Sequence, residues 1–387
     1  MIGLRARIRE HGPLTVAQFM EFALYDSDSG YYARAARRSG RAGDFFTSVD
    51  VGPIFGELLA TQIIEMAAIT TINAEHAEHA EHAEKTFDVV EAGAGNGRLS
   101  ADILRAIRRQ DPALYERLRL HLVEVSADAR AAQRETLGDV SERLSSSSAD
   151  LPASFTGVLL ANELLDALPT HQVVMRPDGL REVFVDLDRD RPETGDGRLT
   201  TTEGPPSTPA LAEYLARLGV VLEPGWRVEI NLRAVEWVRE AVRRLQRGFL
   251  ILIDYGHAAR ELYSVTHATG TLTTFMRHTM EGPERRGHGP AWLERPGEQD
   301  ITAHVDFTSI QRAAEEEGAT TIGLLDQTYF VLGLGAAEME TAELKTRLAL
   351  KTLLMPGGLG STLKVLILGK NTGRPPLRGC SFGLRLT

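Results

Sequence analysis

Residues 87–97, FDVVEAGAGNG, and residues 98–109, RLSADILRAIRR, decide the fold class of this 387-residue chain. An apolar run that ends in glycines predicts a buried strand, and the apolar residues that follow recur at helical spacing. Glycine at Gly93, Gly95 and Gly97 lets the backbone turn tightly and approach a ligand with no Cβ in the way. Strand, glycine turn and helix in this order predict a Rossmann-like sheet that binds a ligand at the turn.

The glycine spacing separates two classes of cofactor. A dinucleotide fingerprint is G-x-G-x-x-G, and counted from Gly93 its last position holds Arg98 instead of glycine. Glu91 precedes the turn, and a carboxylate there favours a ligand that carries cationic groups. S-adenosylmethionine (SAM) carries an α-amino group and a sulfonium centre and has no pyrophosphate. The turn therefore predicts SAM as cofactor, bound by Glu91, Gly93, Gly95 and Gly97, and disfavours a dehydrogenase.

Polar residues follow two further predicted strands, in residues 118–126 (LRLHLVEVS) and 156–169 (TGVLLANELLDALP). The carboxyl ends of parallel strands meet at one edge of the sheet, where open α/β proteins bind their ligands. Glu124 is expected to accept hydrogen bonds from the ribose hydroxyls, and the alternative is an ordinary strand-end charge. Asn162 and Glu163 are expected beside the methyl donor, and the alternative for Asn162 is a helix N-cap.

Predicted strands and helices alternate along most of the chain. Residues 249–256 (FLILIDYG) read as a buried strand, and residues 306–318 (DFTSIQRAAEEEG) as a helix with Asp306 as N-cap and Gly318 at its end. Residues 172–188 predict a hairpin that turns at Pro177-Asp178-Gly179. The alternation predicts an α/β protein with a mostly parallel sheet, in which the last strand can insert antiparallel.

Three parts are expected along the chain. Residues 1–85 form an N-terminal helical cap and linker, because they hold two amphipathic helical patches and a polar loop. Residues 86–375 form the sheet domain, with insertions at about 170–225 and 257–303, and residues 376–387 form a C-terminal tail.

Composition limits the classes of partner. With 43 Lys+Arg against 53 Asp+Glu, the net charge is −10, which disfavours binding to nucleic acid and mildly favours a cationic substrate. No apolar run reaches the ~18–20 residues that span a bilayer. One cysteine, Cys380, excludes an intrachain disulfide and indicates a reducing compartment. Three arginines among the first nine residues hint at a transit peptide, but Glu10 argues against one, so a cytoplasmic location is expected.

Residues 74–84, AEHAEHAEHAE, are a three-residue repeat. On a helix His76, His79 and His82 would lie on roughly one face, and histidine-rich tracts bind metals. A solvated connector is the favoured interpretation, so no metal is predicted.

Five motifs occur in the order of a known family: EAGAGNGRL, LVEVS, ANELLDALP, LIDYG and DITAHVDF. GYY and GDFFTSVDVGPIFGE stand upstream of them. From about residue 12 to residue 369 the chain resembles the MidA-like SAM-dependent methyltransferases. The repeat at 74–84, residues 281–293 and the stretch after Gly335 depart from the family pattern.

The resemblance implies a class I methyltransferase fold, with a Rossmann-like, mostly parallel seven-stranded sheet, and SAM as cofactor. For mitochondrial members it implies symmetric dimethylation of a protein arginine and a role in respiratory complex assembly. The partner expected here is therefore a protein, with a respiratory complex subunit as one option. A homodimer stays open, and neither nucleic acid nor a membrane is an expected partner.

The catalytic candidates are carboxylates, because a guanidinium is a poor nucleophile until its charge is drawn toward some of its nitrogens. Glu163 is placed first, followed by Asp166 and by Asp44 of the upstream loop. Thr47 is expected to touch the carboxylate of SAM, and N-capping is its alternative. Asp254 ends a buried strand at the same edge, and His304 is either a structural hydrogen-bonding group or a base.

Two other functions stay open on the sequence. The first is methylation of a small molecule, which a large apolar cavity closed by residues 257–303 would favour. The second is a SAM-binding assembly chaperone that needs no turnover.

Overall fold

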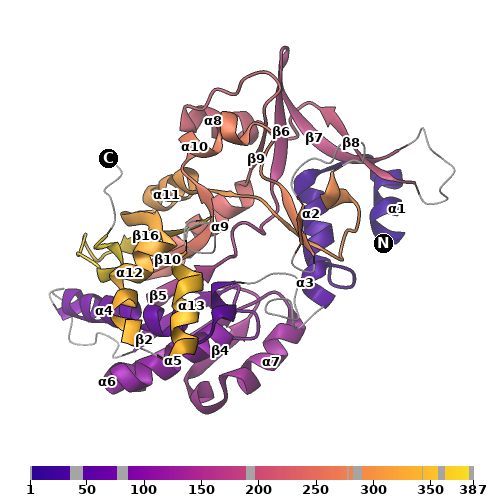
Figure 1. Cartoon of the computed structure of the whole chain (residues 1–387). Coiled ribbons are helices and arrows are strands. Elements are labelled where there is room, and N and C mark those ends of the chain that lie inside the picture. Colours follow the sequence, from indigo (N-terminus) through magenta and orange to yellow (C-terminus); the bar gives the residue numbers. More distant parts are fainter. Residues whose placement is uncertain are drawn as a thin grey trace. The chain divides into compact units, whose positions relative to one another are not determined.

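The computed structural model describes residues 2–34, 47–75, 86–188, 197–276, 279–281, 290–341, 343–355 and 362–382 (Figure 1). The chain forms two compact units, each assembled from three segments. Unit 1 comprises residues 1–46, 165–236 and 256–310, and unit 2 comprises residues 47–164, 237–255 and 311–387. The predicted N-terminal cap therefore contributes to both units. Four residues singled out above lie outside the described residues: Asp44, His76, His79 and His82.

Unit 2 is built on a sheet with the strand order β15-β16-β10-β5-β2-β3-β4. Its strands are β2 (Phe87–Ala92), β3 (Leu118–Val123), β4 (Leu144–Ser148), β5 (Phe155–Asn162), β10 (Leu245–His257), β15 (Thr320–Asp326) and β16 (Leu363–Lys370). Neighbours from β10 to β4 are parallel, whereas β16 and β15 are antiparallel to their neighbours. The predicted α/β fold with a mostly parallel sheet and an antiparallel late strand is confirmed.

The helices of unit 2 alternate with its strands along most of the chain, as crossover connections between parallel strands require. They are α4 (Ile54–Glu75), α5 (Arg98–Gln110), α6 (Pro112–Arg117), α7 (Ala127–Leu137), α12 (Gln327–Gly333) and α13 (Leu344–Leu354). Helices α9 (Leu232–Arg244) and α11 (Phe307–Glu316) cross the boundary between the units. The side chain of Asp306 accepts the N–H groups of Thr308 and Ser309, so its predicted N-cap role is confirmed.

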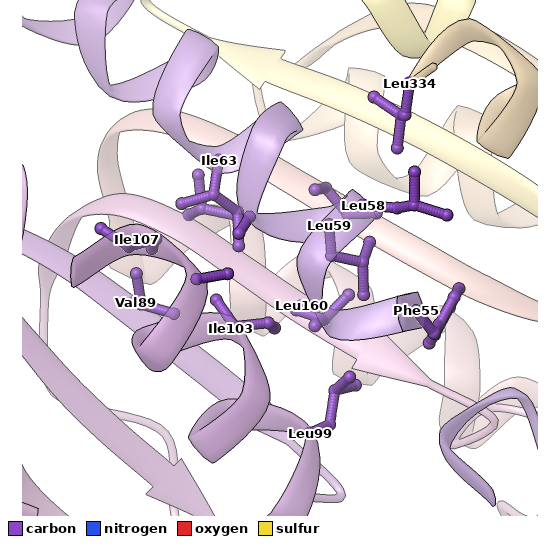
Figure 2. Packing of buried hydrophobic residues seen from close by; sticks show 14 of the residues in the cluster. Phe55, Leu58, Leu59, Ile63, Val89, Leu99, Ile103, Ile107, Leu160 and Leu334 are labelled. Atoms are coloured by element: carbon purple, nitrogen blue, oxygen red, sulfur yellow. The ribbon is translucent and has the colours of Figure 1, made fainter. Parts of the chain in front are cut away.

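The core of unit 2 lies between α4, α5 and the sheet (Figure 2). Leu59 and Ile63 of α4 and Ile103 of α5 are almost fully buried beside Val89 of β2 and Leu160 of β5. Burial of such a side chain stabilises the fold by about 1.5–3 kcal/mol. This core fixes β2 and β5, the strands from which the predicted ligand residues project.

Helix α4 owes its apolar composition to this core. Its residues Ile54–Thr71 are long and apolar enough to cross a membrane by length and composition, and 61% of that stretch is buried inside the protein. Phe55 and Leu58 pack in the same cluster. Packing inside unit 2 accounts for a hydropathy that length alone would assign to a membrane.

Unit 1 contains a second, antiparallel sheet with the order β1-β7-β6-β9, in which β8 also pairs with β7. Its strands are β1 (Leu14–Thr15), β6 (His171–Arg176), β7 (Gly179–Leu187), β8 (Leu199–Gly204) and β9 (Arg227–Ile230). The predicted hairpin at Pro177–Gly179 is the β6–β7 turn.

A core of its own stabilises unit 1. Helix α2 (Val16–Tyr25) begins at a capping box between Thr15 and Gln18, and its Phe19 ring lies edge-on to Trp292, with 5.5 Å between the ring centroids. The remaining helices of unit 1 are α1 (Ile2–His11), α3 (Tyr31–Arg34), α8 (Ala210–Leu218) and α10 (Ala259–Leu262). Strands β11 (Thr273–Met276), β12 (Thr279–Glu281) and β13 (Asp300–Thr302) form a small sheet.

Candidate active site

The glycine turn after β2 has three residues in the left-handed region. The φ angles of Gly93, Gly95 and Gly97 are +72°, +52° and +84°, which side chains with a Cβ rarely adopt. A Cβ at Gly93 would lie 3.2 Å from Leu164, and one at Gly97 would lie 3.1 Å from Leu122. At Gly95 a Cβ would meet no atom within 4 Å among the described residues. The outer glycines are therefore needed for packing, and Gly95 leaves an open face toward which a ligand can approach.

Glu124 holds this turn from the end of β3. One carboxylate oxygen accepts the N–H of Gly95 at 2.9 Å, and the other accepts the N–H of Ser126 at 2.8 Å. Each oxygen keeps lone-pair capacity for further donors, as a ribose diol requires. Val125, the next residue, is 56% exposed, which sequence reasoning did not single out. An apolar side chain beside a diol acceptor offers contact area to a flat base.

Glu91 projects from β2 and is 5% exposed. Its carboxylate accepts both the backbone N–H and the hydroxyl of Ser100 in the first turn of α5. Burial raises the pKa of Glu91 to about 7, the bonds from Ser100 oppose this shift, and the charge of Glu124 adds to it. Glu91 therefore ties β2 to α5, a contact that the sequence pattern did not predict.

Glu163 follows β5 in a strained backbone conformation. Its φ is +52°, and its N–H donates to the carbonyl of Ile253 at 2.8 Å. Its carboxylate accepts the side-chain amide of Asn162 at 3.0 Å and the N–H of Ser48. Burial and the nearby charge of Asp254 raise the pKa of Glu163 to about 8. Strain of this kind concentrates at functional sites.

Asn162 has an unsatisfied acceptor. Its Oδ1 atom is buried and has no hydrogen-bond partner among the residues that the structure describes, while its Nδ2 donates to Glu163. A buried carbonyl oxygen without a donor costs free energy, which a bound ammonium or hydroxyl group would recover.

Asp254 is the second carboxyl group of this edge. It is 1% exposed and ends the buried part of β10, as the LIDYG motif indicated. Its two oxygens accept the N–H groups of Leu164 and Tyr255 at 3.1 and 2.9 Å. The backbone on both sides of the Glu163 carboxyl is thus fixed by hydrogen bonds.

The 3₁₀ helix η1 (Ser48–Val51) completes the site in unit 2. The N–H and hydroxyl of Thr47 both donate to one oxygen of Asp50, the N3 carboxylate of a capping box at the start of η1. The other oxygen of Asp50 forms an ion pair with Arg98 of α5 at 2.7 Å. Sequence reasoning missed Asp50 and Arg98, although a Thr followed three residues later by Asp is the pattern of a capping box.

The predicted site residues fall into three groups. Unit 2 holds Glu91, Gly93, Gly95, Gly97, Glu124, Asn162, Glu163 and Thr47. Asp166 belongs to unit 1, where it is 6% exposed and its backbone carbonyl accepts the N–H of Ala303 at 3.0 Å. Asp44 lies outside the described residues.

The fold and this edge of unit 2 define a class I SAM-dependent methyltransferase. A family described as "Putative S-adenosyl-L-methionine-dependent methyltransferase" matches residues 58–325, and the chain belongs to that family. Among curated proteins, mitochondrial protein arginine methyltransferase NDUFAF7 of Rattus norvegicus is 30% identical over 86% of this chain and 73% of that protein. The Homo sapiens protein of the same name is 29% identical over 86% of this chain and 72% of its own length.

A solved structure supports the same class. A protein from Burkholderia thailandensis bound to S-adenosyl-homocysteine is similar with a TM-score of 0.84 and 30% identity, over 98% of this chain and 94% of that one. The residues present fit SAM, because the open face at Gly95, the lone pairs of Glu124 and the unpaired oxygen of Asn162 suit its groups. SAM is the cofactor of this protein.

The comparisons correct the expected compartment. The curated relatives reported above are named mitochondrial proteins, so the expectation of a cytoplasmic location is wrong. A reducing compartment and a balanced composition do not distinguish the cytoplasm from the mitochondrion, which is why composition failed here.

Proposed function

We propose that this protein transfers the methyl group of SAM to an arginine side chain of a protein substrate. The observation that carries the proposal is the pair of carboxyl groups of the half-buried Glu163 and the buried Asp254, at the carboxyl ends of two neighbouring parallel strands. The names of the curated relatives support arginine as the acceptor, and the acidity of the pair supports a cationic group.

Two neighbouring carboxyl groups, one half-buried and one buried, favour a cationic partner. The pKa of Glu163 is raised to about 8 because its charged form is desolvated and faces Asp254. A guanidinium between or beside them would neutralise this repulsion and lower that pKa, so its binding and the ionisation of Glu163 would favour each other.

The chemistry divides between the cofactor and the chain. When bound, SAM would supply a methyl group on a sulfonium sulfur, and the neutral thioether S-adenosyl-homocysteine would be the leaving group of the in-line displacement. Glu163 would orient the guanidinium through its N–H groups and draw positive charge away from the nitrogen that attacks. The attacking nitrogen loses a proton, and the Glu163 carboxylate would accept it, since a base whose pKa lies near the working pH transfers protons efficiently. Asp254 would keep a negative charge at the site when Glu163 is protonated, and this charge favours the protonation of Glu163.

Site residues on the cofactor side have separate roles in this proposal. Glu124 would accept the ribose hydroxyls and Val125 would contact the base. Asn162 would accept a donor through its unpaired oxygen, and the Gly95 backbone would lie against the ligand. Glu91, already bonded to Ser100, would act on the amino group of SAM through its charge.

The test is a single-turnover assay. Proteins that co-purify with the chain, including respiratory complex subunits, are incubated with labelled SAM, and modified residues are mapped by mass spectrometry. Glu163→Gln should lower the rate about 10²–10⁴-fold while SAM binding stays within about threefold. Glu116→Gln, whose side chain is 74% exposed, is the matched control and should change neither quantity. Label on another residue type, or an unchanged rate in Glu163→Gln, contradicts the proposal.

The small-molecule alternative gains no support from the cavity found in unit 1. This cavity has a volume of about 10 Å³, enough for one water, and polar side chains such as Tyr214, Glu229 and Asp306 line it.

A further inference from the structure

A cluster of three histidines lies in unit 1, outside the SAM site. His257 ends β10, His267 ends the 3₁₀ helix η4 (Val265–His267), and His304 lies between β13 and β14 (Val305–Asp306). One ring nitrogen from each lies within 4.8 Å of the corresponding atoms of the other two. The ring centroids are 4.7, 5.3 and 6.1 Å apart. We propose that these three histidines bind a divalent zinc ion.

The contacts of the rings resemble those of metal-bound histidines. Nδ1 of His267 lies 3.1 Å from the backbone carbonyl of Glu261, and Nδ1 of His257 lies 3.0 Å from the carboxylate of Glu261 without the geometry of a hydrogen bond. Ligating imidazoles are usually oriented in this way, through a carboxylate or carbonyl at the nitrogen that does not face the metal. One residue of α10, Glu261, thus lies beside both rings.

His304 provides the third ligand, and it has a buried ring nitrogen that a bound ion would satisfy. Its backbone N–H donates to the hydroxyl of Thr271 at 3.0 Å, which fixes the segment. Its Nδ1 atom is buried and has no hydrogen-bond partner among the described residues. Neutral imidazole is the form that binds metals, and a bound ion would satisfy the orphaned nitrogen.

The donor set selects the class of ion. Magnesium and calcium prefer oxygen ligands, whereas imidazole suits zinc and its chemical neighbours. With Zn–N bonds of about 2.0–2.1 Å, tetrahedral ligands are about 3.3 Å apart, so the cluster must contract by at most about 1.5 Å. His257 and His267 are half-buried, so neither ring is fully enclosed by neighbouring atoms that would prevent it from turning toward an ion. Water or the Glu261 carboxylate, whose side chain is 59% exposed, would fill the fourth position.

This site does not depend on the proposed methyl acceptor. All its residues lie in residues 256–310, which are part of unit 1. A bound ion would link the end of β10, the η4 turn and the segment before β14, which are separated by up to 47 residues of the inserted region.

The experiment uses untagged full-length protein in which His76→Gln, His79→Gln and His82→Gln remove the competing repeat. After treatment with a chelator and dialysis, Zn²⁺ is titrated by calorimetry and Co²⁺ by visible absorption. We expect one ion per chain, with the intense absorption of tetrahedral cobalt. His304→Gln and His267→Gln should weaken binding by more than about 100-fold, and Glu261→Gln by about 10–100-fold.

His11→Gln serves as the control, because His11 has a side-chain exposure of 64% and should leave zinc binding unchanged. Circular dichroism establishes that each variant is folded, and the half-buried His267 decides the matter if His304→Gln unfolds. The proposal is overturned if repeat-free protein binds no zinc at micromolar concentration. Unchanged affinity in folded His267→Gln overturns it equally.

Discussion

The SAM site of unit 2 and the histidine cluster of unit 1 bury ionisable groups with opposite consequences. In unit 2 burial raises the pKa of Glu91 to about 7 and that of Glu163 to about 8. In unit 1 burial lowers the pKa of His304 to about 4. In both places desolvation disfavours the charged form. The carboxyl site is therefore poised to ionise when a cation arrives, and the imidazole site is already in the form that binds a metal.

The two regions also differ in how they are encoded. The ligand edge of unit 2 consists of residues that directly follow strands, so each strand carries its own ligand residue to a common edge. The histidines of unit 1 come from a strand end, a short 3₁₀ helix and a loop, with no shared spacing. Buried groups at strand ends can be read from one sequence, whereas a cluster assembled by loops cannot.

Substitution of Gly95 tests whether the glycine turn of unit 2 binds SAM, and it has the largest expected effect on affinity. Gly95→Val forces a β-branched residue to a φ of +52° and places its side chain on the open face of the turn. SAM affinity, measured by calorimetry, should fall more than 100-fold, roughly the loss expected when a ligand group is blocked.

The matched control is Gly219→Val, which ends α8 in unit 1. Its φ is +69°, and a Cβ there meets no described atom within 4 Å, so it carries a similar backbone strain of about 1–3 kcal/mol. SAM binding should survive in this variant. If both variants bind SAM equally, the turn does not hold the cofactor. If Gly95→Val loses SAM and still supports complex assembly in cells, the function is that of a chaperone.

The pH dependence of methylation tests the role of the Glu163 carboxyl. A base with a pKa of about 8 in the free enzyme is mostly protonated at pH 7, so kcat/KM should rise as pH increases toward 8 and then level off. Glu163→Gln should remove this rise along with most of the activity. A pH profile that is the same in wild type and variant would assign the titration to another group.

Substitution of Glu91 tests whether ionisation of a buried carboxyl group in unit 2 lowers the stability of the fold. Its folded-state pKa of about 7 lies above the ordinary glutamate value of 4.5, so its stabilising contribution is complete below pH 4.5 and is lost as pH rises through 7. Glu91→Gln keeps an oxygen for Ser100 and removes the titration. At pH 8 the variant should be more stable than wild type by on the order of 2–3 kcal/mol in urea unfolding, and at pH 4.5 the two should agree. An equal difference at both pH values would show that packing, not ionisation, separates the two proteins.

The sequence predicted those parts of the fold in which a contiguous stretch of residues forms both the secondary structure and the ligand-binding position. Strand β2, the glycine turn and α5 form one contiguous stretch, and the strand that ends at Asn162 shows as an apolar run. The hairpin at Pro177–Gly179 was predicted because proline, aspartate and glycine in succession strongly favour a tight turn.

Tertiary arrangement accounts for what the sequence did not reveal. The antiparallel sheet of unit 1 joins β1, near the N-terminus, to β7, about 170 residues later, and nothing local encodes that pairing. Pairing of Asp50 with Arg98 and of Glu91 with Ser100 likewise depends on where helices dock. His304 lay in a recognised motif, but its two companions are close to it only in the folded chain.

Substitution of Thr47 has the smallest expected effect, and it distinguishes a capping role of this residue from direct contact with SAM. Its N–H and hydroxyl both bond to Asp50, so Thr47→Ala should remove one cap interaction and lower the free energy of unfolding by about 1 kcal/mol. Because that hydroxyl is already engaged, SAM affinity should stay within about threefold, whereas direct contact with the SAM carboxylate would cost about tenfold or more. Thr47→Ser, which keeps the hydroxyl, should behave as wild type in both measurements. Urea unfolding and SAM calorimetry on the same preparations separate the two roles. A large loss of SAM affinity with unchanged stability would show that Thr47 contacts SAM directly.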